Sequence, residues 1–290
     1  MRENFTPALA CVLVHEGGKD DDPRDPGGRT AYGVIQRRYD QYRVSKGLPK
    51  RDVWSIEPAE RSEIYKTMYW DVILGDRLPA GTDYAVFDGC VNSGDMQAAK
   101  WLQRAINDVR AGIGRGPIAV DGRIGEGTIV ALNEIEDQDK VIAALQGRRL
   151  AMLKNLKTWK YFGNGWGRRV REVQAAAQGA ARGSAPLPLS PIWAKAGGKA
   201  LLSDAKPLPS PTGGAIAGTV GTVTSATTAV TTSAAPIQGV NPWIDHALQA
   251  LLIVGAVAAA AGGLWAVYAA RKARERAEAL DIAVPEAPVA

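Results

Sequence analysis

The stretch from His15 to Gln36 brings together the residue types that cleave a glycosidic bond. It reads HEGGKDDDPRDPGGRTAYGVIQ and places Glu16 nine residues before Asp25 and fourteen before Thr30. A carboxyl group that holds a proton can donate it to the leaving oxygen, while a second carboxylate activates water or stabilises the charge that develops on the sugar. Thr30 would position the water through its hydroxyl. A solvated acidic turn has the same composition, so both interpretations stay open; a calcium loop is disfavoured because the D-x-D-x-D-G order is missing.

The first helix must position Glu16. Apolar residues precede it at spacings of three and four, the period of one helix face, and they are Phe5, Leu9, Val12 and Leu13. Glu16 then lies at the C-terminal end of that face, where the helix dipole and the apolar surroundings both disfavour a charged carboxyl. We therefore expect Glu16 to be protonated more readily than an exposed glutamate. Gly17 and Gly18 are expected to end the helix, since glycine adopts left-handed conformations readily.

The rest of the N-terminal region also has helical periodicity. A second helix is predicted to open at Pro58. Further helices are predicted at 84–90, 96–106, about 139–157 and after Trp166. Alternating strand patterns are nearly absent, so we predict a mainly α domain. Cys11 and Cys90 lie in apolar helical patterns and are predicted to be buried thiols rather than a disulfide or metal ligands.

The chain is mildly basic, with a formal net charge of +5 and an isoelectric point near 9.2 over 290 residues. This charge suits an anionic partner such as nucleic acid, anionic lipid or a wall polymer, but it is equally compatible with a protein that has no such partner. The only histidines are His15 and His246, which disfavours a conventional zinc site. We expect no metal and no cofactor.

The C-terminal part of the chain changes composition twice. Residues 183–243 are mostly Ala, Gly, Pro, Ser, Thr and Val and lack the large side chains of a core, so we predict a flexible linker. Within 244–270, the 24 residues 247–270 carry no charge, enough for a transmembrane helix. The tail 271–290 begins RKARER, so the positive-inside bias predicts a cytoplasmic tail and a catalytic region outside the bacterial inner membrane. No export signal is evident at the N-terminus.

The stretch from His15 to Gln36 also resembles the signature of glycoside hydrolase family 108, which reads roughly E-G-G, several residues, then D-P-x-D-x-G-G-x-T-x-Y-G-I-[ST]. Its members are bacterial and phage N-acetylmuramidases of the lysozyme-like superfamily. The resemblance implies a lysozyme-like helical domain with Glu16 as its catalytic glutamate. Similarity to the phage-type lysozyme triad assigns supporting roles to Asp25 and Thr30. The sequence departs from the signature at Gln36, where serine or threonine is common, and in the acidic run 20–22.

Three later segments resemble the peptidoglycan-binding domain that usually follows this catalytic domain. They are YAVFDGCVNSGDMQAAKWLQRAIN (84–107), VDGRIGEGTIVALN (120–133) and FGNGWGRRV (162–170). The resemblance therefore implies a catalytic domain over 1–80 and a helical wall-binding domain over 81–182.

Tyr32, Asn92 and Trp166 are the candidate substrate-binding residues. Asn92 and its neighbour Asp88 would reach sugar or peptide groups, although helix-capping and turn hydrogen bonds explain Asp88 at least as well. Trp101 and Trp166 are interpreted either as sugar-stacking surfaces or as core residues.

The expected function is hydrolysis of the β-1,4 bond between N-acetylmuramic acid and N-acetylglucosamine in peptidoglycan. The protein would be a phage or prophage endolysin or a muramidase associated with secretion. Two alternatives stay open: a non-catalytic wall-binding scaffold tethered to the membrane, and a holin-like lysis protein built on the apolar C-terminal segment. No nucleic-acid partner is expected.

Overall fold

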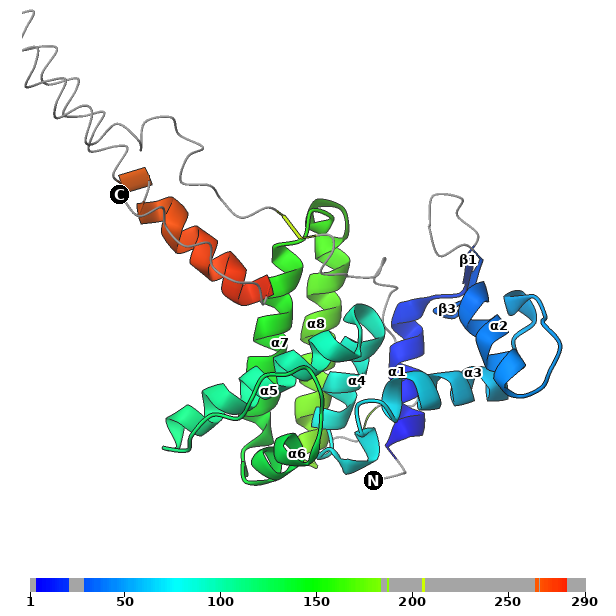
Figure 1. Cartoon of the computed structure of the whole chain (residues 1–290), viewed down its shortest axis with the longest axis horizontal. Helices are drawn as coiled ribbons and strands as arrows, with labels where there is room; N and C mark the ends of the chain where they lie inside the picture. Colours follow the sequence, from blue (N-terminus) through cyan, green and yellow to red (C-terminus); the bar gives the residue numbers. More distant parts are fainter. Residues whose placement is uncertain are drawn as a thin grey trace, which may run out of the picture. The chain divides into compact units, whose positions relative to one another are not determined.

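The computed structural model describes residues 4–20, 29–183, 187, 205–206, 264–265 and 267–280. The chain divides into two compact units, Met1–Ala205 and Lys206–Ala290. The boundary predicted between residues 80 and 81 falls inside the first unit, so a division into catalytic and wall-binding domains stays a prediction. The mainly helical class is confirmed for the described residues (Figure 1).

The described part of the first unit is built mainly from α-helices. Their bounds are α1 Phe5–Glu16, α2 Gln36–Ser45, α3 Pro58–Tyr65, α4 Thr82–Ser93, α5 Asp95–Gly112, α6 Glu126–Asn133, α7 Gln138–Lys154 and α8 Trp159–Ala181. Single turns add the 3₁₀-helices η1 Val53–Ser55 and η3 Gly75–Arg77 and the π-helix η2 Lys66–Trp70. The helix predicted to open at Pro58 does so. The segment of α2, QRRYDQYRVS, was not predicted because few apolar residues mark its buried face.

Helix α4 lies at the centre of the unit. It contacts α1, α5, α7 and α8, and every residue from Thr82 to Asn92 is buried. A helix buried on all sides normally carries apolar residues only. This one also carries Asp83, Asp88 and Asn92, and buried polar groups need hydrogen-bond partners inside the protein. Asp83 accepts a hydrogen bond of 2.7 Å from Asn4, and the partners of the other two define the candidate site.

A small antiparallel sheet follows α1, in the order β1 Lys19–Asp20, β2 Thr30–Ala31 and β3 Val34–Ile35. Its strands are too short to produce an alternating pattern, so the sequence pattern predicts no sheet here. The two residues between β2 and β3, Tyr32 and Gly33, have φ values of +51° and +79°. Positive φ at both positions is the requirement of a type I′ hairpin turn, in which asparagine-glycine is the usual pair. A tyrosine in this conformation is strained.

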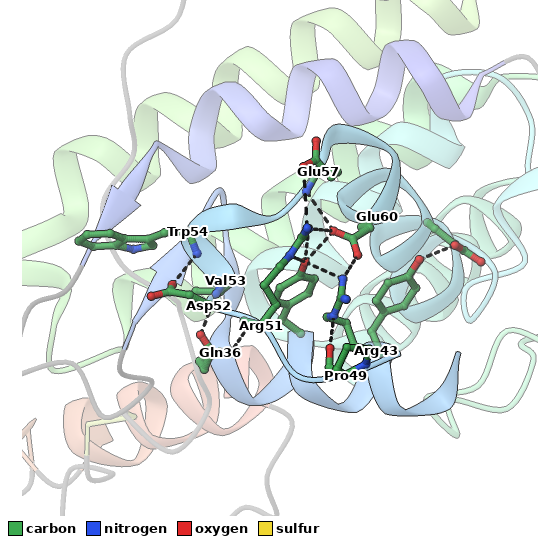
Figure 2. Close-up of polar contacts among 12 residues, drawn as sticks. Gln36, Arg43, Pro49, Arg51, Asp52, Val53, Trp54, Glu57 and Glu60 are labelled. Atoms are coloured by element: carbon green, nitrogen blue, oxygen red, sulfur yellow. Dashed lines mark hydrogen bonds and ion pairs between the residues drawn. The ribbon is translucent and has the colours of Figure 1, made fainter. Parts of the chain in front are cut away.

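Beside this sheet, partly buried charges join α2 to α3 and to the loop between them (Figure 2). Glu60 accepts hydrogen bonds from Tyr39 and Arg51, both at 2.6 Å, and forms an ion pair with Arg43. Burial favours the protonated form of Glu60, but these donors outweigh it and lower the pKa of its carboxyl. Gln36 donates to the carbonyl of Arg51 at 2.8 Å. The residue that departs from the family signature therefore holds the loop that precedes α3.

In the second unit, residues 264–265 and 267–280 are helical. Almost all of the predicted linker 183–243 and most of the predicted membrane segment 244–270 lie outside the described residues. Within the part of the chain that the structure describes, no helix is long and apolar enough to cross a membrane. The linker, the membrane span and the topology stay predictions.

Candidate functional site

Glu16 is the last residue of α1, and its side chain is only 7% exposed. Gly17 follows with a φ of +75°, a backbone conformation that favours glycine, so the predicted end of the helix is confirmed. The other residues of the buried face include Phe5, Leu9 and Val12, as their spacing predicted. The carboxyl group of Glu16 is therefore held on the core side of the helix.

Arg169 from α8 contacts this carboxyl group directly. Its Nη1 and Nη2 atoms each lie 3.1 Å from Oε1 of Glu16, and the arginine side chain is 2% exposed. The same guanidinium contacts Asp88 of α4, with Nη2 at 2.8 Å from Oδ1. Arg169 therefore bridges two carboxyl groups that come from different helices.

A second buried arginine completes the network. Nη1 of Arg149, on α7, lies 2.6 Å from Oδ2 of Asp88, and its Nη2 donates to Asn92 at 3.2 Å. When both carboxyls are ionised, two negative charges face two positive charges, so the network is neutral as a whole. Charges buried this deeply are stable only when paired in this way. Burial favours a protonated Asp88, but Arg169 and Arg149 outweigh it and hold the pKa of Asp88 well below its usual range.

Two sets of effects act on the charge of Glu16 in opposite directions. The helix end and the apolar face, both evident from the sequence, favour a protonated carboxyl, as does burial. The guanidinium of Arg169 favours the carboxylate. The expectation of an easily protonated Glu16 therefore omitted its contact with Arg169.

The hairpin closes over Glu16 from the other side. A Cβ atom added to Gly33 would lie 2.7 Å from Oε2 of Glu16 and 2.4 Å from the hydroxyl of Tyr65. That hydroxyl donates a hydrogen bond of 2.9 Å to the carbonyl oxygen of Tyr32. Only glycine allows this approach, because any side chain at position 33 would displace the carboxyl or the phenol. The Tyr-Gly pair in the sequence thus forms one wall around Glu16.

The other predicted site residues differ in where they lie. Thr30 is in β2 and half-buried, and Tyr32 occupies the turn beside Glu16. Asp25 lies outside the described residues, so its pairing with Glu16 stays a prediction. Asn92 and Trp166 are each 1% exposed.

Burial changes the interpretation of these last two residues. Asn92 accepts a hydrogen bond from Arg149 and so belongs to the charge network. The indole of Trp166 packs near Phe162 and Trp159, with ring centroids 5.5 and 6.4 Å away, and offers no exposed face for sugar stacking in this structure. Asp88 likewise belongs to the network and reaches no surface. These three residues lie in the core rather than on an exposed surface.

Sequence reasoning gave no role to Arg169 or Arg149. Arg169 is the arginine of the Trp-x-x-Arg element in FGNGWGRRV, so a signal was present but unassigned. For Arg149 the signal is weaker: it is a charged residue at a buried position of α7. Pairing it with Asp88 requires the fold, because 61 residues separate the two.

Two comparisons find known proteins that are similar to this chain. Residues 9–94, from α1 to just past the end of α4, match the family model described as Glycosyl hydrolase 108. The solved structure of Brucella abortus SagA shares 34% sequence identity with this chain, at a TM-score of 0.52. That similarity covers 63% of this chain and 98% of the SagA chain. The chain belongs to the glycosyl hydrolase 108 family.

Family 108 membership, together with the similarity to SagA, supports a peptidoglycan hydrolase. No curated protein matches the sequence significantly. The residues matched by the family model contain Glu16, Asp88 and the hairpin, whereas both arginines of the network lie beyond residue 94. The buried charge network that contains Glu16 and Asp88 is therefore completed by arginines of helices α7 and α8.

His15, next to Glu16, makes stability depend on pH. Burial, the largest effect, lowers the pKa of His15 from 6.5 to about 4, with Arg169 and Arg149 contributing and Asp88 and Glu16 opposing. In the unfolded chain this histidine binds a proton near pH 6.5, so its contribution is full above that pH and is lost as pH falls towards about 4. The loss is about 3 kcal/mol, since each pKa unit corresponds to about 1.4 kcal/mol.

We expect His15→Gln to remove this dependence. Burial raises the pKa of Asp83 to about 6, which acts in the opposite direction over a similar range, so the pH dependence of the unmodified protein alone does not isolate His15. Urea unfolding of both proteins at several pH values isolates His15, because Asp83 is common to both. Between pH 7 and pH 4 the variant should gain about 3 kcal/mol relative to the unmodified protein. A difference that does not vary with pH would contradict a neutral buried histidine.

Proposed function

We propose that this family 108 hydrolase is an N-acetylmuramidase that cleaves the β-1,4 bond between N-acetylmuramic acid and N-acetylglucosamine. The observation that carries the proposal is the position of Glu16: it ends α1, is nearly buried, contacts Arg169 and lies against Gly33 of the hairpin. This position provides one carboxyl group with a fixed orientation, which general-acid catalysis requires.

In the proposed reaction, Glu16 donates its proton to the oxygen that leaves the muramic acid. Arg169 then stabilises the carboxylate that remains, since its guanidinium already contacts Oε1. Asp25 and Thr30, carried by the segment between Glu16 and the hairpin turn, are proposed to orient the attacking water or to stabilise the charge on the sugar. We also propose that the enzyme acts in the periplasm, anchored through the apolar segment 244–270.

The test is the chemical identity of the new sugar end. Purified peptidoglycan would be digested with the full chain, reduced with borohydride and hydrolysed, and its reduced amino sugars identified. A muramidase exposes muramic acid at each new reducing end, so muramitol should accumulate. Accumulation of glucosaminitol instead would place cleavage at the other glycosidic bond. Absence of any new reducing end would exclude hydrolysis and favour a wall-binding protein without catalysis.

A further inference from the structure

We propose that Arg61, together with the ring of Tyr32, forms a subsite for a carboxylate of the peptidoglycan chain next to the scissile bond. This inference rests on the proposed function, because it deepens the site around Glu16. It assigns to the enzyme a recognition element for the acidic sugar or its attached peptide. It would therefore make the enzyme prefer peptidoglycan to neutral polymers of N-acetylglucosamine.

Arg61 lies on the same helix face as a residue that borders Glu16. Tyr65 follows Arg61 by four residues in α3, so the two side chains occupy neighbouring positions on one face. The position next to Gly33 lies within contact distance of both the Tyr65 hydroxyl and Oε2 of Glu16, so phenol and carboxyl border the same space. Arg61 is thus one helical turn away from a direct neighbour of Glu16.

Arg61 also contacts the ring of Tyr32 in the hairpin turn. The guanidinium carbon of Arg61 lies 4.6 Å from the centre of the Tyr32 ring, a distance at which a cation is attracted to an aromatic face. The backbone of Tyr32 is fixed by the hydrogen bond from Tyr65 and by its own amide, which donates to the carbonyl of Gly18 at 3.0 Å. The strained turn therefore presents its ring as a rigid platform under the arginine.

Arg61 carries a charge that no acid of the described residues neutralises. Its Nε–H group is buried and donates no hydrogen bond within the described part of the chain. The glutamates of α3 and of its N-cap pair with other cations: Glu57 and Glu60 with Arg51, and Glu63 with Lys46. A half-buried guanidinium stacked on an aromatic ring has a fixed plane, which matches the planar, two-oxygen geometry of a carboxylate.

The proposed substrate supplies such a carboxylate close to the bond that is cleaved. Muramic acid differs from N-acetylglucosamine by a lactyl group, which carries either a free carboxylate or the stem peptide with carboxylates of its own. Both sources share one chemistry, and an arginine beside the general acid would bind either. The mildly basic charge of the chain agrees with an anionic polymer as ligand.

The experiment compares Arg61→Gln with the unmodified full chain on three glycan substrates. They are intact peptidoglycan strands, strands from which an amidase has removed the stem peptides, and intact strands whose carboxylates have been converted to methylamides. Arg115→Gln is the matched control, because Arg115 is an exposed arginine in a loop after α5 and its loss changes net charge equally. Thermal unfolding of each variant reports whether the fold is retained.

We expect Arg61→Gln to raise KM on intact strands about tenfold, the loss of one charge-assisted hydrogen bond, while Arg115→Gln changes it less than about twofold. On methylamidated strands the two variants and the unmodified enzyme should be equal. If the KM of Arg61→Gln stays higher than that of the unmodified enzyme on peptide-free strands, Arg61 binds the lactyl carboxylate. If that difference in KM disappears on these strands, Arg61 binds the stem peptide. Arg61→Lys should restore part of the affinity, since it keeps the charge but loses the planar fork.

An equal rise in KM for Arg61→Gln on native and on methylamidated strands would contradict the proposed carboxylate subsite. That result is distinct from a failure of the proposed function, which would appear as an unmodified enzyme that produces no muramitol from any strand. If muramitol forms and Arg61→Gln leaves the KM unchanged, the proposed function holds and only the Arg61 subsite is contradicted.

Discussion

Glu16→Gln is expected to lower the rate of peptidoglycan hydrolysis by a factor on the order of 10²–10⁴ while the fold remains intact. Glutamine has the shape of glutamate but cannot donate a proton to the leaving oxygen. Its amide oxygen can still accept from Arg169, which also retains its contacts with Asp88, so the buried network keeps a hydrogen-bond acceptor at each position. The rate would be measured as the release of reducing ends from purified strands.

The matched control is Glu126→Gln. Glu126 also pairs with an arginine, since the two terminal nitrogens of Arg77 lie 2.8 and 2.9 Å from its oxygens, but both side chains are exposed. This variant removes the same charge from a similar ion pair away from the hairpin and should leave activity within about twofold of the unmodified protein, because an exposed pair contributes little. Comparable activity in Glu16→Gln and in the unmodified enzyme would contradict the role of Glu16 as general acid.

The position of Glu16 was predictable because it depends on local chemistry. A three-four spacing of apolar residues defines one helix face, and a glycine after the glutamate ends the helix. These signals lie within a dozen residues of each other, so no tertiary information is needed. The same holds for the start of α3, where proline occupies the first turn.

The partners of Glu16 were not predictable from spacing. Arg169 is 153 residues away in the sequence, and only the packing of α8 beside α4 brings it to the end of α1. The same packing buries Asn92 and Trp166, which the sequence suggested as contacts for substrate. A polar residue in an apolar helix is ambiguous by itself: it is either a ligand contact or one half of a buried pair, and its partner decides which.

The hairpin was not predictable from the sequence for a different reason. Thr-Ala-Tyr-Gly-Val contains the turn, but its strands have two residues each, which is too few for a period of two to be recognised. Tyrosine is also an unusual first residue in a turn with positive φ. The family signature contains this Tyr-Gly pair, and the contacts of Gly33 with Glu16 and Tyr65 give its physical reason.

Asp88→Asn is expected to destabilise the fold by about 3–5 kcal/mol, because it leaves buried Arg149 with no carboxylate among its contacts and Arg169 with the carboxylate of Glu16 alone. Asp88 is fully buried and pairs with Arg149 at 2.6 Å and with Arg169 at 2.8 Å. Asparagine keeps the size of the side chain, so the loss would come from uncompensated charge rather than from a cavity. The measurement is the free energy of unfolding in urea at pH 7, where the unmodified carboxyl is ionised.

Asp108→Asn is the control variant for Asp88→Asn. Asp108 forms a two-point contact with Arg148, at 2.8 and 2.6 Å, but its side chain is 46% exposed. The same substitution in the same type of pair should then cost less than about 1 kcal/mol, since water solvates the arginine that remains. The difference between the two losses therefore compares a buried carboxylate that pairs with two arginines with a half-exposed carboxylate that pairs with one. Equal losses of unfolding free energy would mean that the charge of Asp88 contributes little to the network. Arg169 would then hold Glu16 by packing rather than by an ion pair.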